Sequence, residues 1–148
     1  MIISHQYKFI FIKTRKTAGT SIEAFLSQCC GPDDIFTPIT PSVASHQPRN
    51  HAGFYNHISG HEVRARLGCE QWESYFKFCV ERNPWDKVLS FYHFVRVFWY
   101  AGDLSLAEFL ETKYFRVDWP LYTDPFAPGQ LLVDKVLRYE TLADDLAQ

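Results

Sequence analysis

The sequence lacks the features of a membrane-spanning or exported chain. No apolar run approaches the roughly 20 residues that a transmembrane helix needs. The first residues, MIISHQYKFIFIK, lack the basic, apolar and small-residue order of a signal peptide. We therefore expect a cytoplasmic protein without a transmembrane segment. A location in the Golgi lumen would require that a leader or anchor had been removed from the chain.

Cysteine pairs and positive charge are also scarce. The four cysteines form no CxxC pair, and the adjacent Cys29 and Cys30 do not suit a mutual disulfide, so reduced thiols are expected. The formal net charge of −2 gives no global basic field, which argues against duplex nucleic acid as a partner. Any binding site for an anion must therefore be local.

Apolar and aromatic residues, in contrast, are abundant. The 148 residues are 47% hydrophobic and 17% aromatic, which is enough to bury one core of ordinary size. We expect a single globular domain over residues 1–148, either complete or truncated at its C-terminal end. The sequence contains no internal repeat and predicts no particular oligomeric state.

Three times along the chain, an expected strand runs through a loop into an expected helix. The strands are expected at residues 7–12, 75–81 and 131–139, and the following helices begin near residues 20, 84 and 141. Two shorter helices, 59–67 and 105–111, each open with a Ser-x-x-Glu capping box. This order predicts an α/β fold of three layers, with a central, mainly parallel sheet between helices, like that of P-loop NTPases.

The helix expected from Pro84 onward carries the strongest pattern. Asn83 suits the N-cap and Pro84 suits the first helical position. Apolar residues follow along one stripe, namely Trp85, Val88, Leu89, Tyr92, Val95 and Trp99. Trp85, Phe91, Phe94, Phe98 and Trp99 are interpreted as core or as the wall of a substrate pocket, because they follow helical spacing.

The segment IKTRKTAGTSIEAFL is the first candidate site for an anion. It places Lys13, Arg15 and Lys16 before a small-residue turn that opens a helix, where free backbone N–H groups and the positive end of the helix dipole converge. The order differs from the GxxxxGK[ST] loop of nucleoside triphosphatases, in which the lysine follows the glycines. The alternative is an ordinary turn with solvated basic side chains.

The segment VERNPWDKVLSFYHF is the second candidate. Arg82 ends a strand and Ser90 lies in the second turn of the next helix, so a guanidinium and a hydroxyl could bind one phosphate together. The alternative is that Asn83 and Pro84 only begin a helix, while Arg82 pairs with an acid.

Taken together, KTAGTS and RNPWDKVLS resemble the 5′-phosphosulfate loop and the 3′-phosphate motif of the sulfotransferases. The resemblance is to the branch of carbohydrate sulfotransferases, of the heparan-sulfate 2-O type. VLRYETL is similar to that family's tyrosine-glutamate segment near the adenine, and the resemblance spans residues 7–146. It implies a P-loop-like fold, the donor 3′-phosphoadenosine-5′-phosphosulfate (PAPS), the product 3′-phosphoadenosine-5′-phosphate (PAP), and no metal.

The resemblance also implies roles for single residues. Lys16 would contact the oxygen that bridges phosphate and sulfonate, and Arg82 and Ser90 would bind the 3′-phosphate. Tyr139 would lie against the adenine, whereas Glu140 is expected to be structural. The 5′-phosphate would be held by the loop residues Thr17, Ala18, Gly19, Thr20 and Ser21.

Transfer to a hydroxyl requires a base, for which histidine is suited. His57 is the first candidate, because the carbohydrate branch often has a histidine between the two phosphate motifs, and His61 is the second. His46, His51, His57 and His61 could instead bind zinc, although no HExxH order is present.

The acceptor implied by the resemblance is a sugar hydroxyl, with lipids and small metabolites as alternatives. Two other functions stay open at this point. One is a P-loop kinase for a small molecule, disfavoured by the order of the lysine and by the absence of a paired acidic motif for magnesium. The other is a non-catalytic or truncated nucleotide-binding module, because the family usually continues beyond the tyrosine-glutamate segment.

Overall fold

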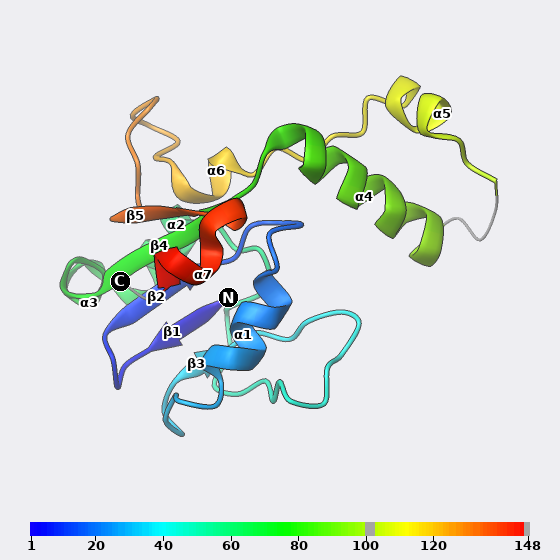
Figure 1. The fold of residues 1–148 in the computed structure, drawn as a ribbon. Coiled ribbons are helices and arrows are strands. Elements are labelled where there is room, and N and C mark those ends of the chain that lie inside the picture. Colours follow the sequence, from blue (N-terminus) through cyan, green and yellow to red (C-terminus); the bar gives the residue numbers. More distant parts are fainter. Residues whose placement is uncertain (100–102, 147–148) are drawn as a thin grey trace.

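The chain folds around a five-stranded sheet in a computed structural model that describes residues 1–99 and 103–146. The strands follow the order β3-β1-β2-β4-β5 across the sheet (Figure 1). Their bounds are β1 Ile2–Ser4, β2 Phe9–Ile12, β3 Ile35–Phe36, β4 Phe76–Glu81 and β5 Lys135–Arg138.

The sheet is mixed, which corrects the expectation of a mainly parallel one. β2 pairs with β4 and β4 pairs with β5 in parallel, as expected. β1, however, pairs antiparallel with both β2 and β3. Neither β1 nor β3 is predicted from the sequence, because strands of three and two residues are too short to show a period.

Helices follow β2, β4 and β5, as the repeated pattern predicts. Their bounds are α1 Gly19–Leu26, α2 Gly60–Leu67, α3 Cys69–Ser74, α4 Pro84–Phe98, α5 Leu106–Glu111, α6 Trp119–Tyr122 and α7 Leu142–Leu146, with the 3₁₀ turn η1 at Tyr139–Thr141. The capping boxes of α2 and α5 and the Asn83 N-cap of α4 are confirmed. In the part of the chain that the structure describes, none of these helices is long and apolar enough to cross a membrane.

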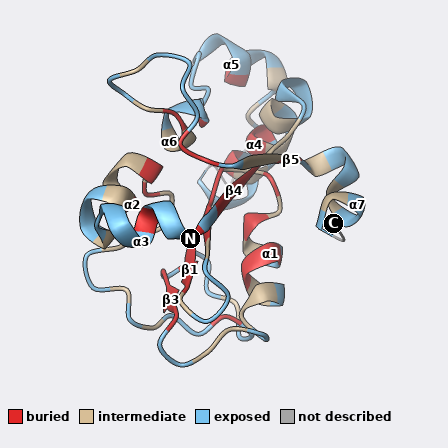
Figure 2. Ribbon diagram, turned by 90° about the vertical axis from the view of Figure 1, so that its left-hand side faces the viewer, coloured by how far each residue is buried: buried red, intermediate tan, exposed pale blue. Residues whose placement is uncertain are grey.

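Helices cover both faces of the sheet, so the expected α/β/α layering is present around the mixed sheet. Ile10 and Ile12 of β2 face one side, where they join a core cluster with Val63 of α2 and Trp72 of α3. Phe11 points to the other side, because side chains alternate along a strand, and joins a cluster that includes Ile22 of α1 and Leu142 of α7. The buried residues therefore concentrate in the sheet and in the helix faces against it (Figure 2).

α4 does not lie flat on the sheet but projects from it, with α5 alongside (Figure 1). A third cluster, formed by Phe91, Tyr92 and Val95 of α4 with Phe109 of α5, holds this pair of helices together. The expected apolar stripe is buried only in part, because Trp85, Leu89 and Trp99 are exposed. The interpretation as core or pocket wall is wrong for Trp85 and Phe98, which are 78% and 56% exposed and line no described cavity. We call α4, α5 and the segment 113–122 the arm.

Candidate functional site

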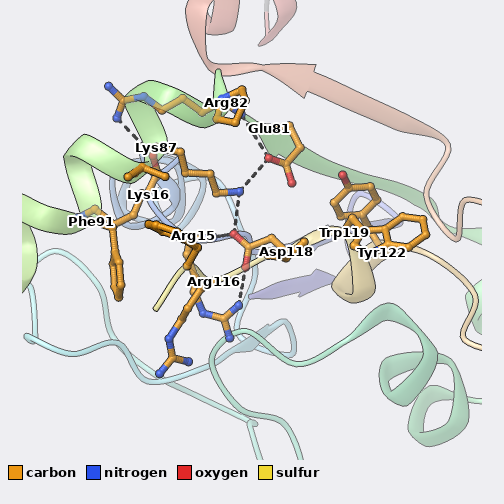
Figure 3. A pocket seen from close by; sticks show the side chains of 14 residues that line it. Arg15, Lys16, Glu81, Arg82, Lys87, Phe91, Arg116, Asp118, Trp119 and Tyr122 are labelled. Atoms are coloured by element: carbon orange, nitrogen blue, oxygen red, sulfur yellow. Dashed lines mark hydrogen bonds and ion pairs between the residues drawn. The ribbon is translucent and has the colours of Figure 1, made fainter. Parts of the chain in front are cut away.

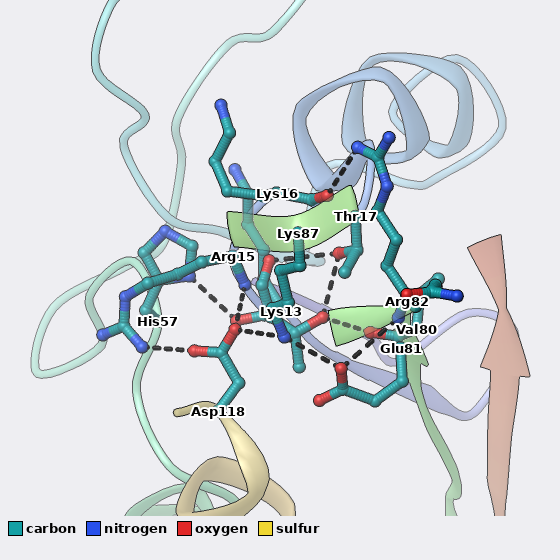
Figure 4. Close-up of polar contacts among 12 residues, drawn as sticks. Lys13, Arg15, Lys16, Thr17, His57, Val80, Glu81, Arg82, Lys87 and Asp118 are labelled. Atoms are coloured by element: carbon teal, nitrogen blue, oxygen red, sulfur yellow. Dashed lines mark hydrogen bonds and ion pairs between the residues drawn. The ribbon is translucent and has the colours of Figure 1, made fainter. Parts of the chain in front are cut away.

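The parallel strands bring three of the predicted site residues together. The carboxyl ends of β2, β4 and β5 lie at one edge of the sheet. Arg82 and Tyr139 directly follow β4 and β5, and Lys16 lies in the loop that follows β2. The Arg82 guanidinium donates to the Lys16 carbonyl oxygen at 3.4 Å (Figure 4). It also lies over the Tyr139 ring, 4.2 Å from the ring centroid. Lys16 and Tyr139, which lie 66 and 57 positions from Arg82 in the sequence, thus form one cluster with it.

Of the three basic residues before α1, two are paired with buried acids and one is not. The Lys13 ammonium lies 2.5 Å from a carboxylate oxygen of Glu23, which is fully buried. Arg15 forms an ion pair with Asp118, whose side chain is also fully buried. Lys16 forms no ion pair with the described residues and instead lies over the Phe94 ring. The interpretation of all three as solvated side chains is therefore wrong for Lys13 and Arg15.

Lys16 and Arg82 make a local excess of positive charge. Burial, and then the charge of Arg82, lower the pKa of the Lys16 ammonium. Arg82 forms no ion pair with the described residues, so the alternative in which it pairs directly with an acid is not observed, although its charge helps to lower the pKa of Glu140. Its Nε is buried without a hydrogen-bond partner. Because buried polar groups are nearly always paired, this donor and the two cations fit an anionic group such as a phosphate.

The loop before α1 has the backbone of a phosphate-binding turn. Lys16 and Ala18 adopt positive φ angles of 61° and 59°, in the left-handed region that non-glycine residues rarely occupy. Turns of this kind direct successive backbone N–H groups toward one point. A Cβ on Gly19 would lie 2.8 Å from Cγ of Lys13, which is too close for an undisturbed contact. Glycine at the first position of α1 therefore leaves room for the buried Lys13 side chain.

The hydroxyl residues of the two motifs have different surroundings. Thr17 is fully buried, and its hydroxyl bonds to Thr14, so it holds the loop rather than facing a ligand. The Thr20 hydroxyl accepts from the Lys13 ammonium at 3.3 Å at the start of α1. Ser21 is exposed. Ser90 is half-buried on α4.

Two cavities meet at this loop. The loop cavity, of about 440 Å³, is lined by the loop residues Ala18, Gly19 and Thr20 and by His57. The arm cavity, of about 400 Å³, lies between α4 and the segment 115–122 (Figure 3). The residues that line both cavities are Arg15, Lys16, Phe91 and Arg116. Lys16 therefore stands at the junction. Ser90 and Tyr139 line neither cavity.

His57 is held in one tautomer. Its Nδ1 lies 2.9 Å from the Lys13 carbonyl oxygen, and because a carbonyl only accepts, Nδ1 carries the proton (Figure 4). Nε2 is then the basic nitrogen of the neutral ring. Burial lowers the pKa of His57 to about 4, and the charges of Arg15 and Lys13 act in the same direction. The ring is therefore neutral near pH 7, with the lone pair of Nε2 free, but the same low pKa makes it a weak base in the free protein.

The other histidines lie elsewhere. His61 packs edge-on against the Phe126 ring and lines neither cavity. His46 is buried and its Nε2 lies 2.8 Å from the Thr37 carbonyl oxygen, so neither joins His57. Within residues 1–99 and 103–146, no three His, Cys, Asp or Glu side chains gather in a way that could hold a metal ion.

The structure adds a buried acid, Asp118, that sequence reasoning missed. Asp118 accepts from the Arg15 backbone N–H at 2.8 Å, from the Arg15 guanidinium, and from the Lys87 ammonium at 2.8 Å. Lys87 bridges in turn to Glu81 at 2.8 Å (Figure 3). This network of four residues connects the loop before α1 and the end of β4 to two parts of the arm, α4 and the segment 113–122. Asp118 lies 103 residues from Arg15 in a proline-rich stretch without a period, so no sequence signal marks it.

Comparison with known proteins gives one family and one relative. The model of a family described as the sulfotransferase family matches residues 1–147. A protein of Archaeoglobus fulgidus, described as uncharacterized, is 38% identical over 88 residues, which cover 58% of this chain and 73% of that protein. No solved structure gives a significant match.

Proposed function

The chain belongs to the sulfotransferase family, and we propose that it moves a sulfonate from PAPS to the hydroxyl group of an acceptor, releasing PAP. One observation carries the choice of donor. Lys16 and Arg82 lie together at the carboxyl edge of the sheet and form no ion pair with the described residues, and Nε of Arg82 is buried without a hydrogen-bond partner. PAPS has two separate phosphates, and each needs cationic donors.

The positions of the side chains support the assignment of the donor groups that the motif resemblance implies. Arg82, stacked on Tyr139, would bind the 3′-phosphate, and Tyr139 would border the adenine. The backbone N–H groups of Ala18, Gly19 and Thr20 would bind the 5′-phosphate at the N-terminus of α1. The buried hydroxyl of Thr17 supports the loop instead, and the roles of Ser21 and Ser90 stay predictions of the motif resemblance.

Lys16 and His57 supply the chemistry of transfer in this proposal. The acceptor oxygen forms a bond to sulfur while the bond from sulfur to the bridging oxygen breaks, and its electron pair stays on the 5′-phosphate of PAP. Lys16 stabilises the negative charge that grows on that phosphate oxygen. Nε2 of His57 takes the proton of the acceptor hydroxyl. Positioning and charge stabilisation carry the rate, as in phosphoryl transfer.

The expectation of a sugar as the acceptor stays a prediction, because it derives from the motif resemblance alone. The absence of a metal requirement likewise stays an expectation, since the cationic side chains would neutralise the phosphates. The cytoplasmic location and the single domain over residues 1–148 are also untested predictions. The family match supports sulfonate transfer over phosphoryl transfer by a kinase.

Transfer is tested by measuring PAP release from PAPS by chromatography, with a panel of sugar, lipid and phenol hydroxyl compounds. The key variant is Lys16→Met, which keeps much of the apolar length and removes the charge. Its kcat is expected to fall by about 100-fold, the size of the loss when a donor to a developing oxyanion is removed. The matched control is Lys8→Met, because Lys8 is exposed in the turn before β2.

The outcomes separate the competing functions. PAP release that depends on an acceptor and on Lys16 supports the proposed enzyme. Tight PAP binding without release for any acceptor would identify a non-catalytic binding module. Equal loss of activity in the Lys16 and Lys8 variants would contradict the role given to Lys16.

A further inference from the structure

The arm cavity adjoins the point where the sulfonate would be transferred. It shares Lys16 with the loop cavity, and Lys16 is the residue assigned to the bridging oxygen. Arg82, assigned above to the 3′-phosphate of the donor, lines the arm cavity as well, so the donor would reach into the part of that cavity next to Arg82. A molecule in the rest of the arm cavity could then present a hydroxyl to the sulfonate beside Lys16. This step rests on the function proposed above.

The walls of the arm cavity are mainly apolar and aromatic. The lining includes Val88 and Phe91 of α4 and Phe115, Val117 and Trp119. Phe91 and Trp119 lie on opposite sides (Figure 3). The exposed fractions of Phe115, Val117 and Trp119 are 43%, 65% and 48%, although all three are large apolar residues. Apolar surface gathered around a concave site is typical of a ligand pocket, because a ligand with an apolar body covers it on binding.

The charges in the cavity complete the description. Both acids, Glu81 and Asp118, are neutralised by Lys87 and Arg15. Arg116 lines both cavities and forms no ion pair with the described residues, and its guanidinium contacts the hydroxyl and ring of Tyr114. The chain as a whole has a formal charge of −2, so this cationic excess is local. An acceptor with a negative group would match it.

We propose that the arm cavity is the acceptor site and takes a small hydroxylated organic acid with an apolar ring or chain. The apolar body would lie between Phe91 and Trp119, and the carboxylate or an equivalent anion would pair with Arg116. The hydroxyl would lie at the junction of the two cavities beside Lys16, because the proposed base His57 lines only the loop cavity. Its oxygen would then form the bond to sulfur as described above, with PAP as the leaving group. A neutral sugar leaves both the apolar walls and Arg116 without a matching group.

The test compares two probes of nearly equal shape, 4-hydroxyphenylacetate and 4-hydroxyphenylacetamide, with methyl glucoside as a neutral sugar. For the wild-type protein we expect kcat/KM to be at least about tenfold higher for the acid than for the amide, from one charge-assisted bond. In Arg116→Gln this ratio should fall toward one, through KM rather than kcat, while PAP affinity is unchanged. Arg64→Gln, a change at a surface ion pair on α2, is the control and should keep the ratio.

Binding of the two probes is also measured by saturation-transfer NMR in the presence of PAP, which requires no turnover. Equal binding of acid and amide to the wild-type protein, or an unchanged preference in Arg116→Gln, would overturn the proposal. Sulfonation of methyl glucoside without sulfonation of the phenolic acid would also overturn it and restore the sugar as acceptor. If PAP itself does not bind, the donor assignment fails, and the acceptor proposal falls with it.

Discussion

Replacing Asp118 by alanine removes the one carboxylate that connects the loop before α1 to the arm. In the folded protein this carboxylate accepts from the Arg15 amide, the Arg15 guanidinium and the Lys87 ammonium, and its side chain is fully buried. The substitution leaves two cations in place without their shared partner. Lys87 keeps its ion pair with Glu81. Arg15 loses both the hydrogen bond from its backbone N–H and the ion pair of its guanidinium.

The magnitude follows from burial. Removing one member of a buried ion pair costs about 3–5 kcal/mol. The side chains of Arg15 and Lys87 are 23% and 13% exposed, so water reaches them in part and the lower end of that range applies. Loss of the hydrogen bond to the Arg15 amide adds about 1 kcal/mol. We expect the free energy of unfolding to fall by about 3–4 kcal/mol in total, with a lowering of Tm by about 10 °C.

Urea unfolding followed by tryptophan fluorescence measures this change, provided that the transition is two-state. The matched control is Glu73→Ala, which breaks the Arg64–Glu73 pair on the surface, where the side chains are 39% and 63% exposed. That pair should contribute at most about 1 kcal/mol. If Asp118→Ala costs no more than Glu73→Ala, the network is not the structural tie described here.

Three further predictions concern single residues. His57 should titrate with a pKa of about 4 in NMR spectra of the free protein, so the stability contributed by its neutral, buried form is complete above pH 6.5 and is lost as the pH falls toward 4; a titration midpoint near 6.5 would contradict its burial. Gly19→Ala should lower the free energy of unfolding by about 1–3 kcal/mol, because the new methyl group displaces the buried Lys13 chain, and an unchanged urea midpoint would show that the loop yields freely. Burial raises the pKa of the Cys79 thiol to about 12, so iodoacetamide at pH 8 should label the exposed Cys29 and Cys69 and leave Cys79 unmodified until the protein unfolds; mass spectrometry of the peptides would detect the contrary result.

The sequence predicted the parts of the fold that repeat a local pattern. β4 and α4 were predicted because an aromatic strand runs into Asn83 and Pro84, both of which are strong start signals for a helix. β1 was missed because its three residues gain their strand structure from pairing with β2 and β3, which no local signal encodes. The parallel half of the sheet was predictable, whereas the antiparallel half depends on that non-local pairing.

The same distinction holds in the site. Lys16 and Arg82 could be selected because Lys16 lies in the loop after one strand and Arg82 follows another, and parallel strands bring their carboxyl ends together. The sequence could not show that Lys13 is neutralised by Glu23 or Arg15 by Asp118, since charge pairing depends on the folded chain. Arg116 was missed for the same reason, because only the folded arm places it beside Lys16.

The donor site is tested most directly by calorimetry of PAP binding, with adenosine 5′-phosphate as the ligand that lacks the 3′-phosphate. The wild-type protein should bind PAP more tightly than adenosine 5′-phosphate, and Arg82→Gln should weaken PAP binding by roughly 10- to 100-fold, the value of a charge-assisted hydrogen bond. Arg64→Gln should bind PAP as the wild-type protein does. Equal affinity for the two nucleotides, or a folded Arg82→Gln variant with unchanged PAP affinity, would contradict the account.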